Sequence, residues 1–290
     1  MGVGGDDGRH RGGGLPAAVP APVRPVVDDL LDDLAATVPH LVTAVHLVGS
    51  AAHGDVHPGV SDLDLVVVLR AKPDPVAMRL LADVVGRATA AHPQWPLDLT
   101  WTTTERLRRP PSPNGVLVHH QLADHGLTVL GQPVVGTAAV ATDPDALRDF
   151  CLAQIADRWT TWWDGAAVLL TRGGRESLRG AGPTAAVLGV VRLHHTLVTG
   201  EVLTPCAAAQ WALQVAEPEW TRLLEESLRA RHTPDRPSLY RNPLQRRRDA
   251  LRFTDLLMTA DEDAFGPGEG FEAVEGGSPV PTTPQAPGRR

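Results

Sequence analysis

One segment, HLVGSAAHGDVHPGVSDLDLVVVL at positions 46–69, limits the fold of this chain more than any other. It begins in a β-type run that ends in Gly49-Ser50, continues through a loop containing Gly54, Pro58 and Gly59, and closes on the apolar run 65–69. Runs of this composition, bounded by Gly and Pro, are typical of strands. The segment therefore predicts two strands joined by a loop, with acidic residues at the start of the second.

The first half of the chain mixes strand and helix patterns. Short β-rich runs predict strands at 43–48, 63–69, 97–103 and 127–130. Apolar residues at helical spacing predict helices at 26–38, at about 75–91 and at about 114–125. This order of elements is typical of a small mixed sheet with helices packed on it.

From about residue 145 the strand signal disappears. Helical patterns follow at about 145–171, 183–198, 205–216, 218–231 and 243–260. We therefore predict an α+β protein, with a sheet-containing domain at 23–135 and an all-helical domain at 140–262. Residues 1–22 and 263–290 are rich in Gly and Pro and offer little apolar surface to bury, so we predict disordered tails there.

The composition excludes several classes of function. A net charge of −7 and a pI of about 5.9 argue against general binding of nucleic acid, which requires a basic surface. We see no apolar run long enough for a membrane span and no apolar core of a signal peptide near the N-terminus. The two cysteines, Cys151 and Cys206, cannot form a disulfide framework or a CxxC zinc motif. We expect a cytoplasmic monomer without nucleic-acid or membrane partners.

The negative net charge is concentrated near the C-terminal end of the chain. Residues 261–290 carry six acidic residues and two arginines, so this segment accounts for −4 of the net −7. The remainder of the chain is close to neutral, and overall acidity therefore says little about partners. Among the basic residues, the only lysine in the sequence is Lys72; all others are arginines.

Asp62 and Asp64 carry the chemical signal of the second predicted strand. Side chains alternate along a strand, so these two carboxylates lie on one side of it, about 7 Å apart. Like charges at this distance repel, and a hard divalent cation such as Mg²⁺, which prefers oxygen ligands, relieves the repulsion. Gly49 lets a phosphate approach the backbone, and Ser50 can donate to its oxygens. The arrangement is suited to metal-assisted phosphoryl chemistry.

The strand predicted at 97–103 adds a third carboxylate. Leu97, Leu99 and Trp101 alternate with Asp98 and polar residues. If this strand lies beside 63–69, Asp98 faces the same cleft and can deprotonate a hydroxyl nucleophile. The alternative is that Asp98 is a surface acid on an edge strand.

These residues resemble a known superfamily. Gly49-Ser50, followed after ten residues by Ser61-Asp62-Leu63-Asp64 and an apolar strand, is similar to the motif of the DNA-polymerase-β-type nucleotidyltransferases. Downstream, the sequences at 188–202, 208–212 and 240–243 resemble the helical domain of the aminoglycoside adenylyltransferases that act on streptomycin and spectinomycin. The resemblance extends over roughly residues 25–260.

The resemblance implies a fold, an activity and a set of roles. It implies a nucleotidyltransferase domain followed by a helical domain, transfer of AMP from ATP to a drug hydroxyl, and antibiotic resistance as the outcome. Asp62 and Asp64 correspond to the Mg²⁺ ligands, and Asp98 corresponds to the catalytic base, which is often Glu in this subgroup. The implied ATP contacts are Gly49, Ser50, Ser61, Arg192 and Tyr240. The family's ATP-contacting lysine is missing, so only Lys72 or an arginine can replace it.

Other residues have two interpretations. Trp159 and Trp163 are one helical turn apart and are interpreted either as helix packing or, with Asp164, as a wall for a cationic acceptor. The pairs His119-His120 and His194-His195 are expected to pack or cap helices. Arg246–Arg248 is most simply a solvated helix surface, although arginine can also stabilise a triphosphate.

Two other functions stay open at this point. The chain could transfer a nucleotide to a protein side chain, or it could be a sensor that binds a nucleotide without catalysis.

Overall fold

The computed structural model describes residues 15–134, 139–179 and 181–259. A four-stranded mixed sheet forms the centre of the first part, in the order β3-β2-β1-β4. The parallel pair β2–β3 lies beside β1, which runs antiparallel to both β2 and β4. The strands are β1 (Val42–Leu47), β2 (Leu63–Leu69), β3 (Leu97–Thr103) and β4 (Leu127–Leu130). All four predicted strands are confirmed, to within one residue at each end.

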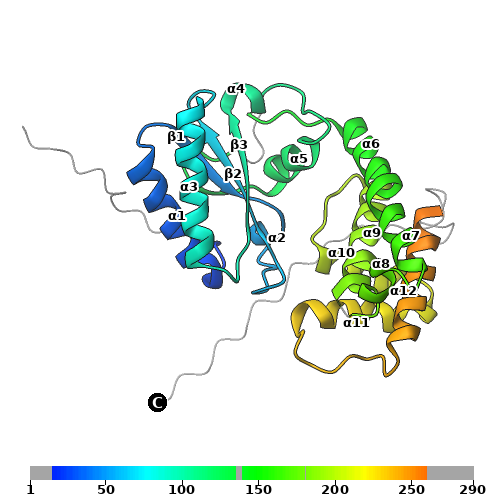
Figure 1. Ribbon diagram of the computed structural model, residues 1–290. Coiled ribbons are helices and arrows are strands. Elements are labelled where there is room, and N and C mark those ends of the chain that lie inside the picture. Colours follow the sequence, from blue (N-terminus) through cyan, green and yellow to red (C-terminus); the bar gives the residue numbers. More distant parts are fainter. Residues whose placement is uncertain (1–14, 135–138, 180, 260–290) are drawn as a thin grey trace, which may run out of the picture.

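The sheet buries a different core on each side. The helices α1 (Arg24–Thr37) and α3 (Pro75–Ala91) cover one side, and α5 (Val116–His125) covers the other (Figure 1). Along β2, the odd-numbered apolar residues pack against the first core, whereas Val66 and Val68 pack against the second. Asp64 is two residues before Val66, so its side chain lies on the same α5 side of the sheet as Val66 and Val68. The short helices α2 (Gly49–Ala52) and α4 (Thr104–Leu107) follow β1 and β3.

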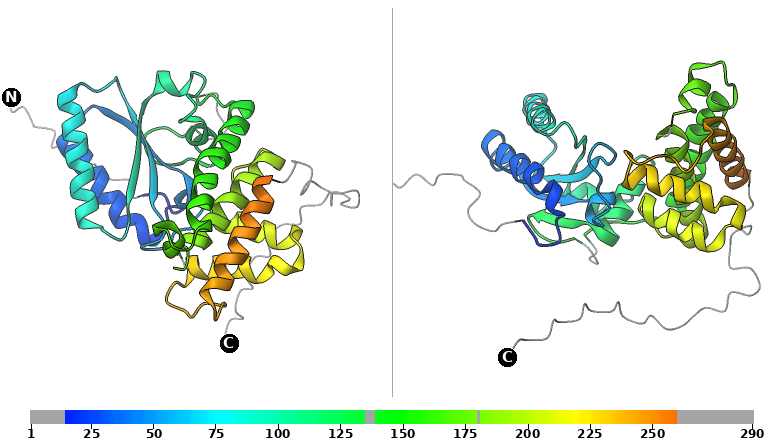
Figure 2. Two further views of the ribbon diagram at one scale, coloured as in Figure 1. Left: turned by 45° about the vertical axis from the view of Figure 1, so that its right-hand side comes forward. Right: turned by 90° about the horizontal axis from the view of Figure 1, so that it is seen from below.

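The second part is helical. It comprises α6 (Pro144–Gln154), the π-helix Ile155–Trp159, α7 (Thr160–Ala167), α8 (Arg172–Glu176), α9 (Ala181–Thr199), α10 (Pro205–Val215), α11 (Thr221–His232) and α12 (Pro243–Thr259). We call residues 139–259 the helical region. Its core gathers around α9, and it lies beside the sheet rather than on top of it (Figure 2). The predicted α+β class is confirmed.

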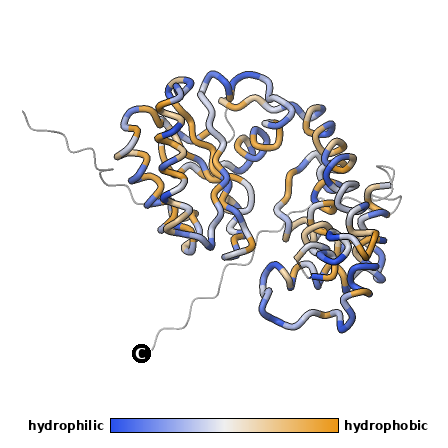
Figure 3. Tube along the Cα trace, viewed as in Figure 1, coloured by the Kyte–Doolittle hydropathy of each residue, from blue (hydrophilic) through white to orange (hydrophobic). Residues whose placement is uncertain are grey.

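A recurring pair of residues defines where several helices begin. Asp74, Asp143 and Thr204 cap α3, α6 and α10 with side-chain oxygens that accept backbone N–H groups, and each is followed by a proline. Proline tolerates the first helical position because its missing N–H has no partner there. Each cap is worth about 1 kcal/mol. Hydrophobic segments run through the strands, and hydrophobic and hydrophilic stretches alternate along the helices of both parts (Figure 3).

Two predictions about element boundaries need correction. Residues 15–22 were predicted as part of a disordered tail, but Val19 is 1% exposed in the first core. Arg24 holds this segment by donating to the carbonyls of Leu15, Pro16 and Val19. The single helix predicted at 145–171 is divided by the π-helix and ends at Ala167. Residues 1–14 and 260–290, which contain the rest of the predicted tails, lie outside the described residues.

The arginine run on α12 is also not the solvated surface we predicted. Arg246 is 6% exposed and Arg247 donates to the carbonyls of Ala166 and Ala167, whereas Arg248 is exposed. Arg246 belongs to a cluster centred on the fully buried carboxylate of Glu226. The Glu226 oxygens accept from Arg229, Ser238 and the backbone N–H of Leu239 over 2.7–3.1 Å. We call Glu226, Arg229, Ser238 and Arg246 the Glu226 cluster.

Both histidine pairs have the packing role that we predicted. His119 and His120 are buried and contact the backbone of Ala141 and Asp143. His194 and His195 are buried on α9, where the ring of His195 lies 4.9 Å from that of Trp211. Within the described residues, none of the helices has the length and apolar character needed to cross a membrane.

Candidate functional site

The turn after β1 is built around Gly49. This residue has φ of +60°, a conformation that residues with a Cβ rarely adopt. A Cβ at this position would collide with Oδ2 of Asp64. Because β1 and β2 are antiparallel, the end of β1 meets the start of β2, and the N–H of Val48 donates to the carbonyl of Asp64. Glycine is therefore required here for two reasons, the backbone conformation and the close approach of a carboxylate.

Three carboxylates gather where β2 and β3 begin. In the parallel register Asp64 is the direct partner of Asp98, so both side chains lie on the same side of the sheet. Asp62 precedes β2 by one residue and shares that side. Asp62 and Asp98 are exposed, and Asp64 is partly buried. We call these three residues the acidic cluster; the expectation that the strand 97–103 lies beside 63–69 is confirmed.

The electrostatics of the acidic cluster are those of like charges held together. Burial, followed by the charges of Asp62 and Asp98, raises the pKa of Asp64 to about 6. The positive charge of Arg192 opposes this shift. Carboxylates in such a group supply several oxygen ligands and gain from a cation placed among them, so the acidic cluster fits a hard divalent cation such as Mg²⁺.

The helical region contributes positive charge opposite the acidic cluster. Arg192 lies on α9, and burial lowers the pKa of its guanidinium although the charge of Asp64 opposes the change. The charges of Arg158, from the π-helix, and Arg231, from the last turn of α11, also act on Arg192. Arg192 therefore acts on Asp64 directly, and arginines from two further helical segments lie near Arg192.

Arg231 connects the helical region directly to the loop between Ser50 and Ser61, which we call the predicted phosphate loop. Its Nη2 donates to the hydroxyls of Ser50, at 3.3 Å, and Ser61, at 3.2 Å. Ser61 is itself buried and accepts from the N–H of His57. The side chains of Ser50 and Ser61 therefore lie together beside a cation, as a phosphate-binding pair requires.

Sequence reasoning missed Arg231 and Arg158. The missing lysine was a signal that another cation must be present, but it did not identify which arginine. Arg231 lies 170 positions after Ser61 in the chain, and only the packing of α11 brings the two together. Arg158 depends on the π-helix, which helical periodicity did not predict.

The structure gives Tyr240 a packing role rather than a place beside the acidic cluster. The side chain is 5% exposed in the core of the helical region, and Arg222 stacks on its ring at 4.1 Å. Burial raises the pKa of Tyr240 to about 12. The predicted contact between Tyr240 and the nucleotide stays a prediction.

Trp159 and Trp163 are likewise engaged in packing. The indole of Trp159 lies against the backbone of α9 so closely that a Cβ at Gly189 would overlap its ring. The Nε1 of Trp163 donates to the carbonyl of Leu251 on α12 at 3.0 Å. Asp164 is exposed on α7. Of the two interpretations of these tryptophans, the geometry favours helix packing.

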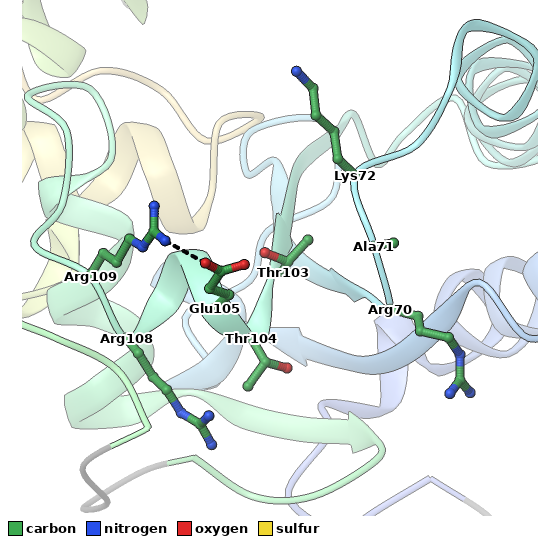
Figure 4. A pocket seen from close by; sticks show the side chains of 8 residues that line it. All are labelled: Arg70, Ala71, Lys72, Thr103, Thr104, Glu105, Arg108 and Arg109. Atoms are coloured by element: carbon green, nitrogen blue, oxygen red, sulfur yellow. Dashed lines mark hydrogen bonds and ion pairs between the residues drawn. The ribbon is translucent and has the colours of Figure 1, made fainter.

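A cavity of about 710 Å³ lies elsewhere. It is found at the opposite ends of β2 and β3, lined by Arg70, Lys72, Arg108 and Arg109 among others (Figure 4). Arg109 pairs there with Glu105, and the side chain of Lys72 extends away from this ion pair (Figure 4). The acidic cluster occupies the starts of these strands, so Lys72 lies at the wrong end of the sheet to replace the missing lysine.

Comparison with known proteins agrees with this geometry. Residues 27–114 match the family model described as the nucleotidyltransferase domain. The sheet-containing part of the chain is a nucleotidyltransferase domain. The match extends from α1 beyond β3 and includes Gly49, Ser50 and the whole acidic cluster. No curated protein sequence matches the chain.

Solved structures extend the likeness to the helical region. A spectinomycin adenyltransferase, AAD(9), from Enterococcus faecialis, crystallised with ATP and spectinomycin, is similar over 80% of this chain and 98% of its own, at 11% identity and a TM-score of 0.57. A toxin–antitoxin protein crystallised with AMP-PNP matches 49% of this chain and 94% of its own, at 19% identity. Its TM-score of 0.27 is too low to define a shared fold. The nucleotidyltransferase domain and the helical region thus have the arrangement found in the first of these structures.

Proposed function

We propose that this protein transfers AMP from ATP to a hydroxyl group of an aminoglycoside-type antibiotic of the streptomycin or spectinomycin kind. One observation carries the proposal: Asp62, Asp64 and Asp98 meet at one edge of a nucleotidyltransferase sheet, opposite arginines of the helical region. The carboxylates can bind a cation and activate a hydroxyl, and the arginines can hold a polyphosphate. Inactivation of the antibiotic would be the biological result.

Asp62 and Asp64 are the residues that would hold Mg²⁺. Their oxygens suit a hard cation, and the raised pKa of Asp64 comes from burial and from repulsion by Asp62 and Asp98, both of which a bound cation offsets. Bound there, Mg²⁺ supplies charge neutralisation to the phosphates of ATP. The cation thus allows a nucleotide with several negative charges to approach an edge that would otherwise repel it.

In this proposal Asp98 acts as the base. It is exposed on β3 and directly opposite Asp64, so an acceptor in the cleft can reach it. Asp98 takes the proton of the acceptor hydroxyl as its oxygen bonds to the α-phosphorus of ATP. The bond between the α-phosphorus and the oxygen bridging to the β-phosphorus breaks, and pyrophosphate leaves with that electron pair.

Arg231 takes over the task of the absent lysine in this proposal. It already contacts the hydroxyls of Ser50 and Ser61, which flank the predicted phosphate loop. A guanidinium can bind two phosphate oxygens at once, and its charge stabilises the leaving pyrophosphate. Arg192, near Asp64, adds a second positive charge on the same side.

The acceptor is proposed to be cationic for two reasons. Carboxylates exposed at the cleft attract a polycationic molecule and raise its rate of association. In addition, the neighbouring structure with the same arrangement of sheet and helices contains ATP and spectinomycin. Trp159 and Trp163 pack within the helical region, so Asp164, exposed on α7, is the member of the predicted acceptor wall that remains available.

The decisive experiment on the base is a pair of variants. Asp98→Asn should abolish the release of pyrophosphate from ATP, Mg²⁺ and spectinomycin or streptomycin, because the amide cannot accept the proton. Asp83→Asn, which changes an exposed acid on α3, should leave the rate unchanged. Full activity of Asp98→Asn would remove Asp98 from the role of base.

Labelled ATP added to a cell lysate distinguishes the acceptors. Label that appears on protein rather than on the drug would favour a transferase that modifies proteins. Calorimetry that detects binding of Mg-ATP without turnover on any aminoglycoside would favour a nucleotide sensor.

A further inference from the structure

A second group of chemically distinctive side chains lies next to Arg231. Asp55 and His57 belong to the loop between α2 and β2, Cys206 belongs to the first turn of α10, and His232 is the last residue of α11. Each offers one ligand atom, and these four atoms all lie within 4.8 Å of one another. The nucleotidyltransferase domain therefore provides two members of the group and the helical region provides the other two.

The contacts within the group converge on one point. The Nε2 of His57 lies 2.9 Å from Oδ1 of Asp55, and the Sγ of Cys206 lies 3.0 Å from Nε2 of His232. The rings of His57 and His232 are 4.8 Å apart between centroids, and the N–H of Cys206 points to Oδ2 of Asp55 at 3.4 Å. Four potential ligand atoms from three segments of the chain thus lie close together.

The donor atoms indicate which metal the group would take. One thiolate sulfur, two imidazole nitrogens and one carboxylate oxygen make a tetrahedral set for zinc, whereas Mg²⁺ prefers oxygen ligands alone. We propose that Asp55, His57, Cys206 and His232 form a structural zinc site that joins the nucleotidyltransferase domain to the helical region. It is separate from the acidic cluster, which offers only carboxylates.

The surroundings suit such an ion. The aspartate and the cysteine thiolate together balance the two charges of zinc, so the filled site is neutral beside the guanidinium of Arg231, which lies 3.8 Å from Asp55. An open cavity of about 390 Å³, lined by Asp55 and Cys206 among others, gives an ion access to the site. His232 is exposed and can adjust its ring as the ligands close.

The position of His232 beside Arg231 means that a bound zinc ion would also orient Arg231. His232 follows Arg231 directly in the chain, and Arg231 contacts Ser50 and Ser61. Zinc bound to His232 and to the loop carrying Asp55 would fix Arg231 against the phosphate loop. It would hold the two parts of the protein together whatever the acceptor is, so the inference stands or falls independently of the proposed drug.

The test measures metal directly. The full-length protein is loaded with zinc, dialysed against metal-free buffer, and its zinc content is determined by elemental analysis. We expect one zinc per chain in the wild type and almost none in Cys206→Ser or His232→Ala. The control Cys151→Ala removes the other cysteine, which lies in a different hydrophobic cluster, and should retain the ion. Equal zinc contents in the wild type and Cys206→Ser would overturn the proposal.

A spectroscopic measurement on the wild type guards against a variant that does not fold. Cobalt(II) in place of zinc should give the intense visible absorption of a tetrahedral site together with a sulfur-to-cobalt charge-transfer band in the near ultraviolet. A weak octahedral spectrum without the charge-transfer band would contradict the site, even if the chain retained metal.

Discussion

Two clusters of charged side chains in this protein have opposite designs. The acidic cluster consists of Asp62, Asp64 and Asp98, which have the same sign and lie on one side of the sheet. The Glu226 cluster places one buried carboxylate among two arginines, a serine and a backbone N–H. The pKa of Asp64 is raised to about 6, whereas hydrogen bonds and the charge of Arg229 lower that of Glu226 to about 2.

The difference separates a site that stabilises the fold from one that is prepared for a ligand. Glu226 finds its partners within the protein, so its charge helps to hold α11, α12 and the loop between them together. The acidic cluster is left with repulsion that a cation from outside must remove. Groups of like charges that lack a counter-charge within the protein are expected at functional sites, where a ligand supplies it.

The largest effect should come from Asp64→Asn. Loss of a metal-binding carboxylate should lower the rate of AMP transfer by about 10³-fold or more, since several kcal/mol of charge stabilisation is removed. The folded state should not be weakened, because the repulsion with Asp62 and Asp98 is also removed. Pyrophosphate release and the urea midpoint of unfolding measure the two effects. A large loss of stability in Asp64→Asn would contradict the view that the acidic cluster, unlike the Glu226 cluster, does not stabilise the fold.

Glu226→Gln should have the reverse effect. Removing one partner of a buried ion pair costs about 3–5 kcal/mol, because Arg229 and Arg246 are left without their counter-charge. Urea unfolding should report this loss, while the remaining folded protein keeps its pyrophosphate release. Arg248→Gln, which changes an exposed arginine on α12, is the control and should be nearly neutral. A stability of Glu226→Gln equal to that of the control would show that the cluster contributes nothing.

Arg231→Gln tests whether the helical region completes the acidic cluster. Replacing a charge-assisted contact to phosphate should cost about 1.5–3 kcal/mol, equivalent to about 10- to 100-fold in the KM for ATP or in kcat/KM. Steady-state kinetics with varied ATP measure it, again with Arg248→Gln as the control. Unchanged kinetics would leave the Ser50 and Ser61 contacts as purely structural.

The pH dependence of unfolding should have opposite signs for the two clusters. In Mg²⁺-free buffer, Asp64 holds its proton in the folded state up to about pH 6, so its contribution to stability falls as the pH rises from about 4 to 6. Glu226 stays ionised down to about pH 2, so its contribution falls as the pH drops from about 4.5 towards 2.

The pH dependence of the wild type's stability is compared with that of Asp64→Asn and Glu226→Gln, with unfolding followed in urea at each pH. The expected difference from wild type is about 3 kcal/mol over the relevant range for each residue. Parallel curves for the wild type and both variants would contradict the assigned shifts.

Local patterns predicted the sheet and most of the helices. The apolar run at 63–69 predicted a strand and the helical spacing in 75–91 predicted a helix, and β2 and α3 have those bounds. The placement of Asp98 also followed, because it required only that two strands be neighbours. The elements themselves depend on residues close together in the chain, and Asp98 needed only the pairing of two strands joined by one helix.

Features that depend on distant contacts were not predicted. Arg246 looked like part of a solvated run because its partner Glu226 lies on another helix. Val19 looked like part of a tail because the core that it enters is built from the sheet and α1. The convergence of Asp55 and His57 with Cys206 and His232 depends on the packing of α10 and α11 beside the loop, which no spacing in the sequence reveals.

The most direct test of the central claim is the mass of the acceptor. Full-length protein is incubated with ATP, Mg²⁺ and either spectinomycin or streptomycin, and the drug is analysed by mass spectrometry beside a measurement of pyrophosphate. The acidic cluster and its facing arginines predict a gain of one AMP on at least one drug, with one pyrophosphate released per modified molecule. Unmodified drugs and no pyrophosphate above a reaction without protein would contradict that claim.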